Sequence, residues 1–240
     1  MRMSLAKAVT LGTASAFVLV PAMAAPALAS SAAAPEVQAQ SYPTLHYGDK
    51  GAAVKTLQTK LRALHYDPGT IDGIWGTNTS FAVWAFQKAN GINPSSNAGT
   101  KTWSALAHPK TPKPIVPKGA KSRAEVSIKH QLLFIYKSGK LVLISHISSG
   151  SEQRYYSQGH WSVAHTPRGS FKVYRKAKGW ETSPLGKLYK ANYFTGGYAI
   201  HGEPAVPLHP ASHGCVRVPM GTSNIVAKLL PLGTKVYVHS

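Results

Sequence analysis

Residues 108–122, HPKTPKPIVPKGAKS, divide the chain into two parts with different apolar patterns. Four prolines and four lysines leave no apolar periodicity in this segment, which predicts a semi-rigid, extended, cationic linker. Apolar residues recur at helical spacing before it and alternate as in strands after it. The sequence therefore predicts two domains, one all-α and one mostly β, which the linker separates and keeps apart.

The first residues have the composition of an export signal. Arg2 and Lys7 precede an apolar run, and Ala27-Leu28-Ala29 fits the small-x-small cleavage pattern, so residues 1–29 are predicted to be a secretory signal peptide. Residues 30–41 are predicted to be a disordered spacer. No later stretch is long and apolar enough to span a bilayer, so we expect a secreted protein without stable membrane insertion after cleavage.

The charge of the chain indicates its surroundings. The sequence has 27 Lys plus Arg against 8 Asp plus Glu, a formal net charge of +19. Such an excess is typical of proteins with a polyanionic neighbour, and the alternative is a charge that serves solubility alone. Export argues against a nucleic-acid partner and leaves acidic wall polymers as candidates.

Residues 42–107 are predicted to form three short helices. Apolar residues three or four positions apart predict one helix that ends before Asp67-Pro68-Gly69, a second from Thr77 to Asn90-Gly91, and a third around Trp103. Three small helices bury too little surface for a deep catalytic cleft. A binding module is therefore expected in this region.

The segment 71–77, IDGIWGT, and the apolar pattern that follows it resemble the signature of a three-helix peptidoglycan-binding module. The resemblance implies that residues 42–107 bind peptidoglycan. Most of the matching positions are turn and core residues, so they do not identify ligand contacts. Trp75, Trp84 and Tyr66 are the candidates, and each fits a core position better than a ligand contact.

Residues 123–240 are predicted to form a mostly β domain. Apolar residues at alternate positions predict strands around 126–128, 132–136 and 141–147, with further strands up to 235–239. One helix, at about 222–230, precedes the last strand. The fold expected is thus multidomain, with a small all-α module followed by a mostly β domain that has one late helix.

Cys215 is the only cysteine in the chain. In an exported protein it has no partner for an intramolecular disulfide, which leaves a packing role, an intermolecular bridge or a reactive thiol. Its polar, glycine-containing neighbours lie between Pro210 and Pro219, which favours a reactive thiol on a loop. Alternating apolar residues upstream predict a strand that ends at His201. Together, a cysteine and a histidine are the minimum equipment for acyl transfer.

Four segments occur in the order of the L,D-transpeptidase catalytic domain, also called the YkuD domain: 147–150 (ISSG), 166–171 (TPRGSF), 196–202 (GGYAIHG) and 212–217 (SHGCVR). Residues 123–240 therefore resemble this domain. The resemblance implies a cysteine acyltransferase that acts on peptidoglycan stem peptides. In that family a cysteine attacks the carbonyl before the terminal D-alanine of a donor tetrapeptide, and an amine of a neighbouring stem resolves the thioester.

The resemblance also implies roles for single residues. Cys215 would be the nucleophile and His201 its general base, with His213 beside the thiol. The positioning residues would be Gly214, Ser212, Gly202 and Arg217. Backbone amides of residues 212–215 are candidates for stabilising the oxyanion, and the Arg217 guanidinium suits a substrate carboxylate.

The carboxylates limit the alternatives. From residue 123 onward there is no aspartate, so a Ser-His-Asp triad is impossible, and a backbone carbonyl such as that of Gly202 is expected to orient the histidine. The histidines lack the short spacing of a zinc site, so no metal and no cofactor are expected. Two alternatives stay open: a thiol L,D-carboxypeptidase that uses water as acceptor, and a non-catalytic wall-binding protein.

Residues 151–165 interrupt two strand patterns and contain the aromatic residues Tyr155, Tyr156 and Trp161. A transpeptidase must exclude water from its acyl-enzyme, so this segment is predicted to be a lid whose aromatic side chains close over the substrate. The alternative is an ordinary surface loop with its aromatic side chains in the core.

Overall fold

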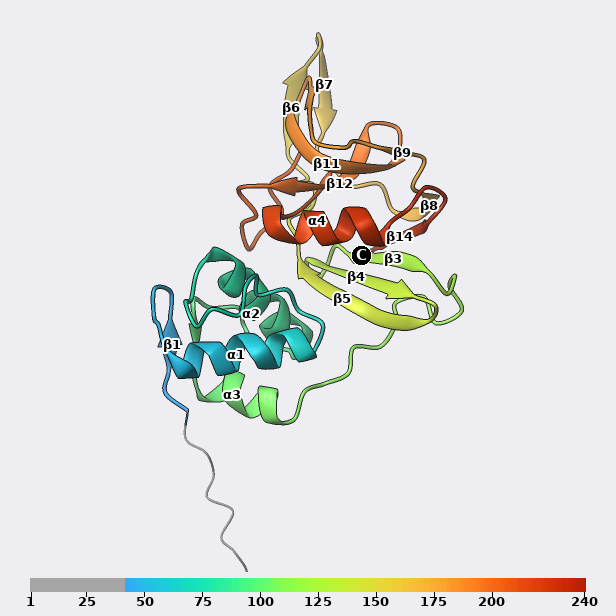
Figure 1. The fold of residues 1–240 in the computed structure, drawn as a ribbon. Coiled ribbons are helices and arrows are strands. Elements are labelled where there is room, and N and C mark those ends of the chain that lie inside the picture. The colour runs from blue at the N-terminus through green and yellow to red at the C-terminus, as the bar shows by residue number, and fades with distance from the viewer. Residues whose placement is uncertain (1–41) are drawn as a thin grey trace, which may run out of the picture. The chain divides into compact units, whose positions relative to one another are not determined.

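The helical region contains the three helices that the apolar spacing predicts. They are α1 (Ala52–Ala63), α2 (Thr77–Ala89) and α3 (Thr100–Ala107), with a short antiparallel pair of strands, β1 (Leu45–His46) and β2 (Asn97–Ala98). The computed structural model describes residues 42–240 (Figure 1), so the predicted signal peptide and spacer lie outside the described residues. No helix within residues 42–240 is long and apolar enough to cross a membrane.

The three aromatic candidates for ligand contact serve the packing of this helical region. Trp75 and Tyr66 are only 1% and 2% exposed. Trp84 is half-buried, and its indole N–H donates to the carbonyl of Ser95 at 3.1 Å. The preference for core positions over ligand contacts therefore agrees with the structure for Trp75 and Tyr66.

The region after residue 122 is mostly β with one late helix, as the apolar pattern predicts. Its strands form two five-stranded sheets and a separate hairpin of β6 (Arg154–Ser157) and β7 (His160–Val163). The first sheet has the order β5-β4-β3-β14-β8, and the second has the order β10-β11-β12-β13 with β9 paired to β11. The bounds of the first sheet are β3 (Arg123–Ser127), β4 (Leu132–Lys137), β5 (Lys140–His146), β8 (Gly169–Lys172) and β14 (Lys235–His239). Those of the second are β9 (Arg175–Lys176), β10 (Trp180–Ser183), β11 (Gly186–Thr195), β12 (Tyr198–Glu203) and β13 (Val216–Pro219), followed by helix α4 (Met220–Leu229).

Strand β4 is buried on both faces. Leu133 and Ile135 join the core between the two sheets, with apolar residues of β12, β13 and α4. Leu132, Phe134 and Tyr136 alternate with them and pack instead into the core of the helical region. An unbroken apolar run is what a strand covered on both sides requires.

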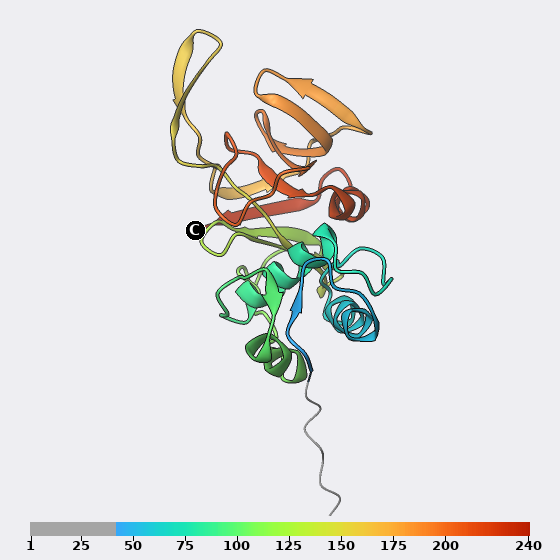
Figure 2. The same cartoon turned by 90° about the vertical axis from the view of Figure 1, so that its left-hand side faces the viewer.

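The helical and β regions therefore share a core, which corrects the expectation that the linker keeps them apart. The described residues 42–240 belong to one compact unit, and α2 packs against β4 and β5, as both views show (Figures 1 and 2). The backbone N–H of Ile144 on β5 donates to the carbonyl of His65 at 2.9 Å. In addition, the hydroxyl of Thr222 donates to the Asp67 carboxylate at 3.0 Å.

The predicted linker is fixed to the β region rather than free. The backbone amides of Ile115 and Val116 donate to the buried carboxylate of Glu125 at 2.7 and 3.3 Å. The Arg123 side chain also donates to Glu125, at 2.6 Å. The proline-rich composition of the segment does not predict these contacts. They depend on the buried carboxylate of Glu125, which lies on the following strand β3.

Candidate active site

Strands β12 and β13 bring Cys215 and His201 together. The two strands pair in parallel, with Ile200 opposite Val216 and His201 opposite Arg217. Ile200 and Val216 are fully buried in the core between the sheets. Side chains alternate across a sheet, so His201, Arg217 and the adjacent Cys215 share the opposite face.

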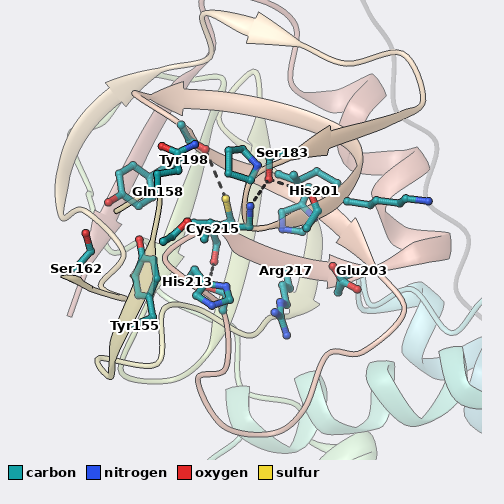
Figure 3. Close-up of a pocket in the computed structure, with 18 of the residues that line it drawn as sticks. Tyr155, Gln158, Ser162, Ser183, Tyr198, His201, Glu203, His213, Cys215 and Arg217 are labelled. Carbon is teal, nitrogen blue, oxygen red and sulfur yellow. Dashed lines mark hydrogen bonds between the residues drawn. The ribbon is translucent and has the colours of Figure 1, made fainter. Parts of the chain in front are cut away.

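That face forms part of a cavity of about 840 Å³. In Figure 3, the hairpin residues Tyr155, Gln158 and Ser162 stand on one side of Cys215, while His201 and Glu203 stand on the other. The cavity brings together side chains from β6, β7, β10–β13 and the loops between them. Of the residues that the sequence singled out, it is lined by Tyr155, His201, Ser212, His213, Cys215 and Arg217.

His201 is buried and oriented by the backbone. Its Nδ1 lies 3.0 Å from the carbonyl oxygen of Gly202, and the residue is only 4% exposed. A carbonyl oxygen only accepts, so Nδ1 carries the proton of the neutral ring and Nε2 keeps its lone pair. Burial lowers the pKa of His201 to about 4, with a smaller contribution from the charge of Arg217. The ring is thus a neutral base at pH 7.

Cys215 is half-buried, and its thiol donates to the carbonyl of Gly197 at 3.7 Å. Burial raises the pKa of the thiol, although a backbone contact at Ala199 and the charge of Arg217 act in the opposite direction. A raised thiol pKa and a lowered imidazole pKa favour the neutral pair over the ion pair. Attack by Cys215 therefore requires proton transfer as the sulfur reacts.

Side-chain and backbone hydrogen bonds fix the loop around Cys215. The Ser212 hydroxyl donates to the carbonyl of Cys215 at 2.5 Å and accepts from the amide of Gly214 at 3.0 Å. The amide of Ser212 donates to the carbonyl of Ser149 at 3.0 Å. Two of the four amides expected around the oxyanion, those of Ser212 and Gly214, thus already donate hydrogen bonds within the protein. The amides of His213 and Cys215 are the better candidates.

Gly214 is required by its backbone conformation and by the space around it. Its φ is +129°, and a Cβ at this position would lie 2.4 Å from Tyr198 Cε1 and 2.7 Å from the carbonyl oxygen of His165. Any side chain here would displace the backbone beside Cys215. The glycine therefore allows Tyr198 to form one wall of the cavity beside the thiol.

Thr166 is a positioning residue that sequence analysis did not single out. Its hydroxyl donates to the carbonyl of Gly214 at 2.8 Å and accepts from the amide of Gly150 at 2.9 Å. It thereby connects three of the four motifs, since it begins the TPRGSF segment. The presence of threonine inside a motif was a signal for such a role, but the partner atoms depend on the tertiary fold.

Comparisons with known proteins identify the family. The family model of the L,D-transpeptidase catalytic domain, YkuD, matches residues 121–238, and that of the peptidoglycan binding domain matches residues 50–106. A solved L,D-transpeptidase structure from Xylanimonas cellulosilytica DSM 15894 is 37% identical, with a TM-score of 0.77 over 82% of this chain and 97% of that chain. The chain belongs to the L,D-transpeptidase family.

Two other proteins to which the chain is similar have lower identity or a shorter match. A solved L,D-transpeptidase (Yku) from Stackebrandtia nassauensis is 24% identical, covers 82% of this chain and 95% of that chain, and has a TM-score of 0.45. The uncharacterized protein in the bpoA1 3′ region of Kitasatospora aureofaciens is 40% identical over 67 residues. That match covers 28% of this chain and 57% of the length of the curated relative.

The predicted lid, residues 151–165, contains a β-hairpin with two different faces. Strands β6 (Arg154–Ser157) and β7 (His160–Val163) pair only with each other among the described strands, and Tyr156 is opposite Trp161. Tyr155 lies on the cavity side, where its ring meets that of the exposed His213 edge to face at 4.8 Å. Tyr156 and Trp161 are on the other face, each 61% exposed.

The expectation that all three aromatic residues close over a substrate is therefore wrong for Tyr156 and Trp161. Side chains alternate between the two faces of a strand, so the neighbours Tyr155 and Tyr156 point in opposite directions. The composition of the segment was typical of a loop and did not predict these strands. Their exposed rings also differ from the alternative in which they pack into the core.

Within residues 42–240, no group of three or more His, Cys, Asp or Glu side chains is arranged to hold a metal ion.

Proposed function

We propose that the protein is a peptidoglycan L,D-transpeptidase of the bacterial cell wall. In this proposal, Cys215 forms a thioester with a donor tetrapeptide stem and D-alanine leaves. An amine of an acceptor stem then resolves the thioester and cross-links the wall. The observation that carries the proposal is the single thiol beside a neutral, backbone-oriented His201 in an open cavity of about 840 Å³.

The protonation states of Cys215 and His201 support acyl transfer by a neutral pair. The thiol proton moves to Nε2 of His201 as Sγ bonds to the substrate carbonyl carbon, and the amides of His213 and Cys215 stabilise the oxyanion. When the tetrahedral intermediate collapses, the bond to D-alanine breaks and His201 returns the proton to the leaving amine. The acceptor amine next attacks the thioester, His201 takes the proton that it loses, and the thiol is restored.

The remaining groups support recognition of a charged peptide. Arg217 shares the face of β13 with Cys215 and lines the same cavity, so its guanidinium can pair with a substrate carboxylate. The helical region, which matches the peptidoglycan binding domain, would hold the glycan or stem of the same polymer. The formal charge of +19 would add attraction to acidic wall polymers at low salt.

A product analysis distinguishes this reaction from its alternatives. The protein is incubated with a tetrapeptide donor, with and without an excess of acceptor stems, and the muropeptides are separated by chromatography. Cross-linked dimers that depend on acceptor concentration are expected. Tripeptides alone, even with abundant acceptor, would assign the protein to the thiol L,D-carboxypeptidases. No turnover by folded protein would favour a wall-binding role.

A further inference from the structure

A partly buried lysine of the helical region contacts a buried histidine of the β region. Nζ of Lys88, on α2, lies 2.8 Å from Nδ1 of His146, at the end of β5, and donates to the carbonyl of Gln131 at 3.4 Å. Burial lowers the pKa of Lys88 to about 8 and that of His146 to about 3. At neutral pH, Lys88 is therefore a cationic donor and His146 is a neutral acceptor at Nδ1.

This contact determines what the other nitrogen of His146 does. Because Nδ1 accepts from Lys88, the ring proton is on Nε2, which lies 2.9 Å from the carbonyl oxygen of Val206 and donates to it. Two aromatic residues of α2 hold the ring in place. Phe81 stacks on it with centroids 5.8 Å apart, and Trp84 meets it edge to face at 5.5 Å.

Val206 belongs to the loop 204–212, which runs from β12 to the segment around Cys215. The loop begins at the cavity, since Glu203 and Pro204 line it. Val206 is buried, and the Ser148 hydroxyl donates to the carbonyl of His209 at 2.9 Å further along. The hydrogen bond from His146 to the carbonyl of Val206 therefore helps to fix the first half of this loop.

A second series of contacts leads from Lys88 to the end of the same loop. The backbone carbonyl that Lys88 contacts is that of Gln131, whose side chain donates to the Ser149 hydroxyl at 2.7 Å and accepts from the Ser149 amide at 2.8 Å. The carbonyl of Ser149 accepts from the amides of Ala211 and Ser212, both at 3.0 Å. Both series therefore begin on α2 and end on the loop.

We propose that Lys88 and His146 are positioning residues for the catalytic cavity, so that the helical region sets the shape of the wall formed by Glu203 and Pro204 and thereby the affinity for the stem peptide. The kinetic part of this inference rests on the proposed function. The positioning of the loop does not, since it is a property of the free protein. The catalytic pair itself is also held by β12, β13 and Thr166, so its reactivity should depend on Lys88 much less than the position of the loop does.

The test uses the full chain with Lys88→Met, which keeps the length of the side chain but removes its charge and donors. Lys55→Met is the matched control, because Lys55 is an exposed lysine on α1. Hydrogen exchange of the ligand-free protein should be at least about 5-fold faster over residues 204–212 in Lys88→Met, the factor for loss of one hydrogen bond, and unchanged in the control.

Kinetics provide the second readout. KM for the donor stem should rise about 5- to 20-fold in Lys88→Met, whereas the rate at which a small thiol reagent alkylates Cys215 should change much less. The variant His146→Phe keeps a buried ring but loses the hydrogen bond to Val206, so it should act similarly. Combining both substitutions should raise KM no more than the larger single change, because both act through one contact.

Unchanged exchange over residues 204–212 in folded Lys88→Met and His146→Phe proteins would overturn the inference. Lower thermal stability with an unaltered KM would reduce these residues to a purely structural role. If Lys88→Met fails to fold, His146→Phe decides the question alone. If the wild-type protein turns over no stem peptide, the proposed function fails, and the exchange measurement still decides whether Lys88 positions the loop.

Discussion

The hydroxyl of Thr166 donates to the carbonyl of Gly214 at 2.8 Å, one residue before the thiol, while it accepts from Gly150. Thr166→Val keeps the shape of the side chain but leaves two buried backbone groups without partners. We expect a loss of about 1–3 kcal/mol in the free energy of unfolding and slower acylation of Cys215. Thr166→Ser, which retains the hydroxyl, should behave nearly like the wild type in both denaturant unfolding and acylation. Equal stability and acylation in the valine variant would contradict this role.

The pH dependence of the reaction should show the lowered pKa of His201. Its ordinary value of 6.5 falls to about 4 in the folded protein, so the base stays unprotonated down to that pH. We expect kcat/KM for the stem peptide to lose its acidic limb only near pH 4, rather than near 6.5. His201→Gln should reduce turnover at pH 7 by about 100-fold or more, and His213→Gln by less. An acidic limb at pH 6 to 7 would contradict a neutral buried base.

Alkylation of Cys215 should depend on pH in the alkaline range. Because burial raises the pKa of the thiol, its labelling by a small reagent in the absence of substrate should be slow at pH 7 and should still increase with pH where an ordinary cysteine is already ionised. Fast, pH-independent labelling between pH 5 and 7 would instead indicate a preformed thiolate.

The two faces of the β6–β7 hairpin give a matched comparison. Tyr155→Ala removes a ring from the cavity wall and from its contact with His213, so we expect a higher KM and more hydrolysis relative to cross-linking. Trp161→Ala removes an exposed ring from the other face and should leave both quantities unchanged. Muropeptide chromatography with donor and acceptor measures both. A larger effect from Trp161→Ala would show that the outer face contacts substrate.

The sequence predicted the residues that gather at the site better than it predicted how they are held. All four family motifs meet around Cys215: Ser148 and His201 pair with Arg217, Gly150 pairs with Ser212, and Thr166 joins Gly150 to Gly214. The expected contact between His201 and the carbonyl of Gly202 is present, because it needs only neighbouring residues. Local patterns also predicted the helices, since spacing and glycine termini are properties of short segments.

The contacts that sequence analysis missed are long-range. Lys88 and His146 are 58 positions apart, and neither position has a pattern that distinguishes a buried charge from a solvated one. The unbroken apolar run in β4 was evidence that both faces are covered, but it did not identify the helical region as the cover. The Pro/Lys-rich composition of residues 108–122 then favoured separate domains, although the buried Glu125 fixes that segment.

The shared core changes what truncation should do. A chain that begins at Lys118 would expose the outer face of β4 and β5, including Leu132, Phe134 and Ile144. We therefore expect this truncated chain to aggregate or to unfold at a much lower temperature than a chain that begins at Tyr42, which keeps every described contact. Light scattering and thermal unfolding measure the difference. A soluble, cooperatively folded 118–240 fragment with unchanged kcat/KM would contradict an essential shared core.

The most direct test of the account is the intact mass of the protein during reaction with a donor tetrapeptide. We predict an adduct equal to the stem without its terminal D-alanine, located by peptide mapping on Cys215 and removed when acceptor stems are added. Folded Cys215→Ala protein should form no adduct and no product. Continued turnover by that variant, or an adduct on any residue other than Cys215, would contradict the cysteine mechanism.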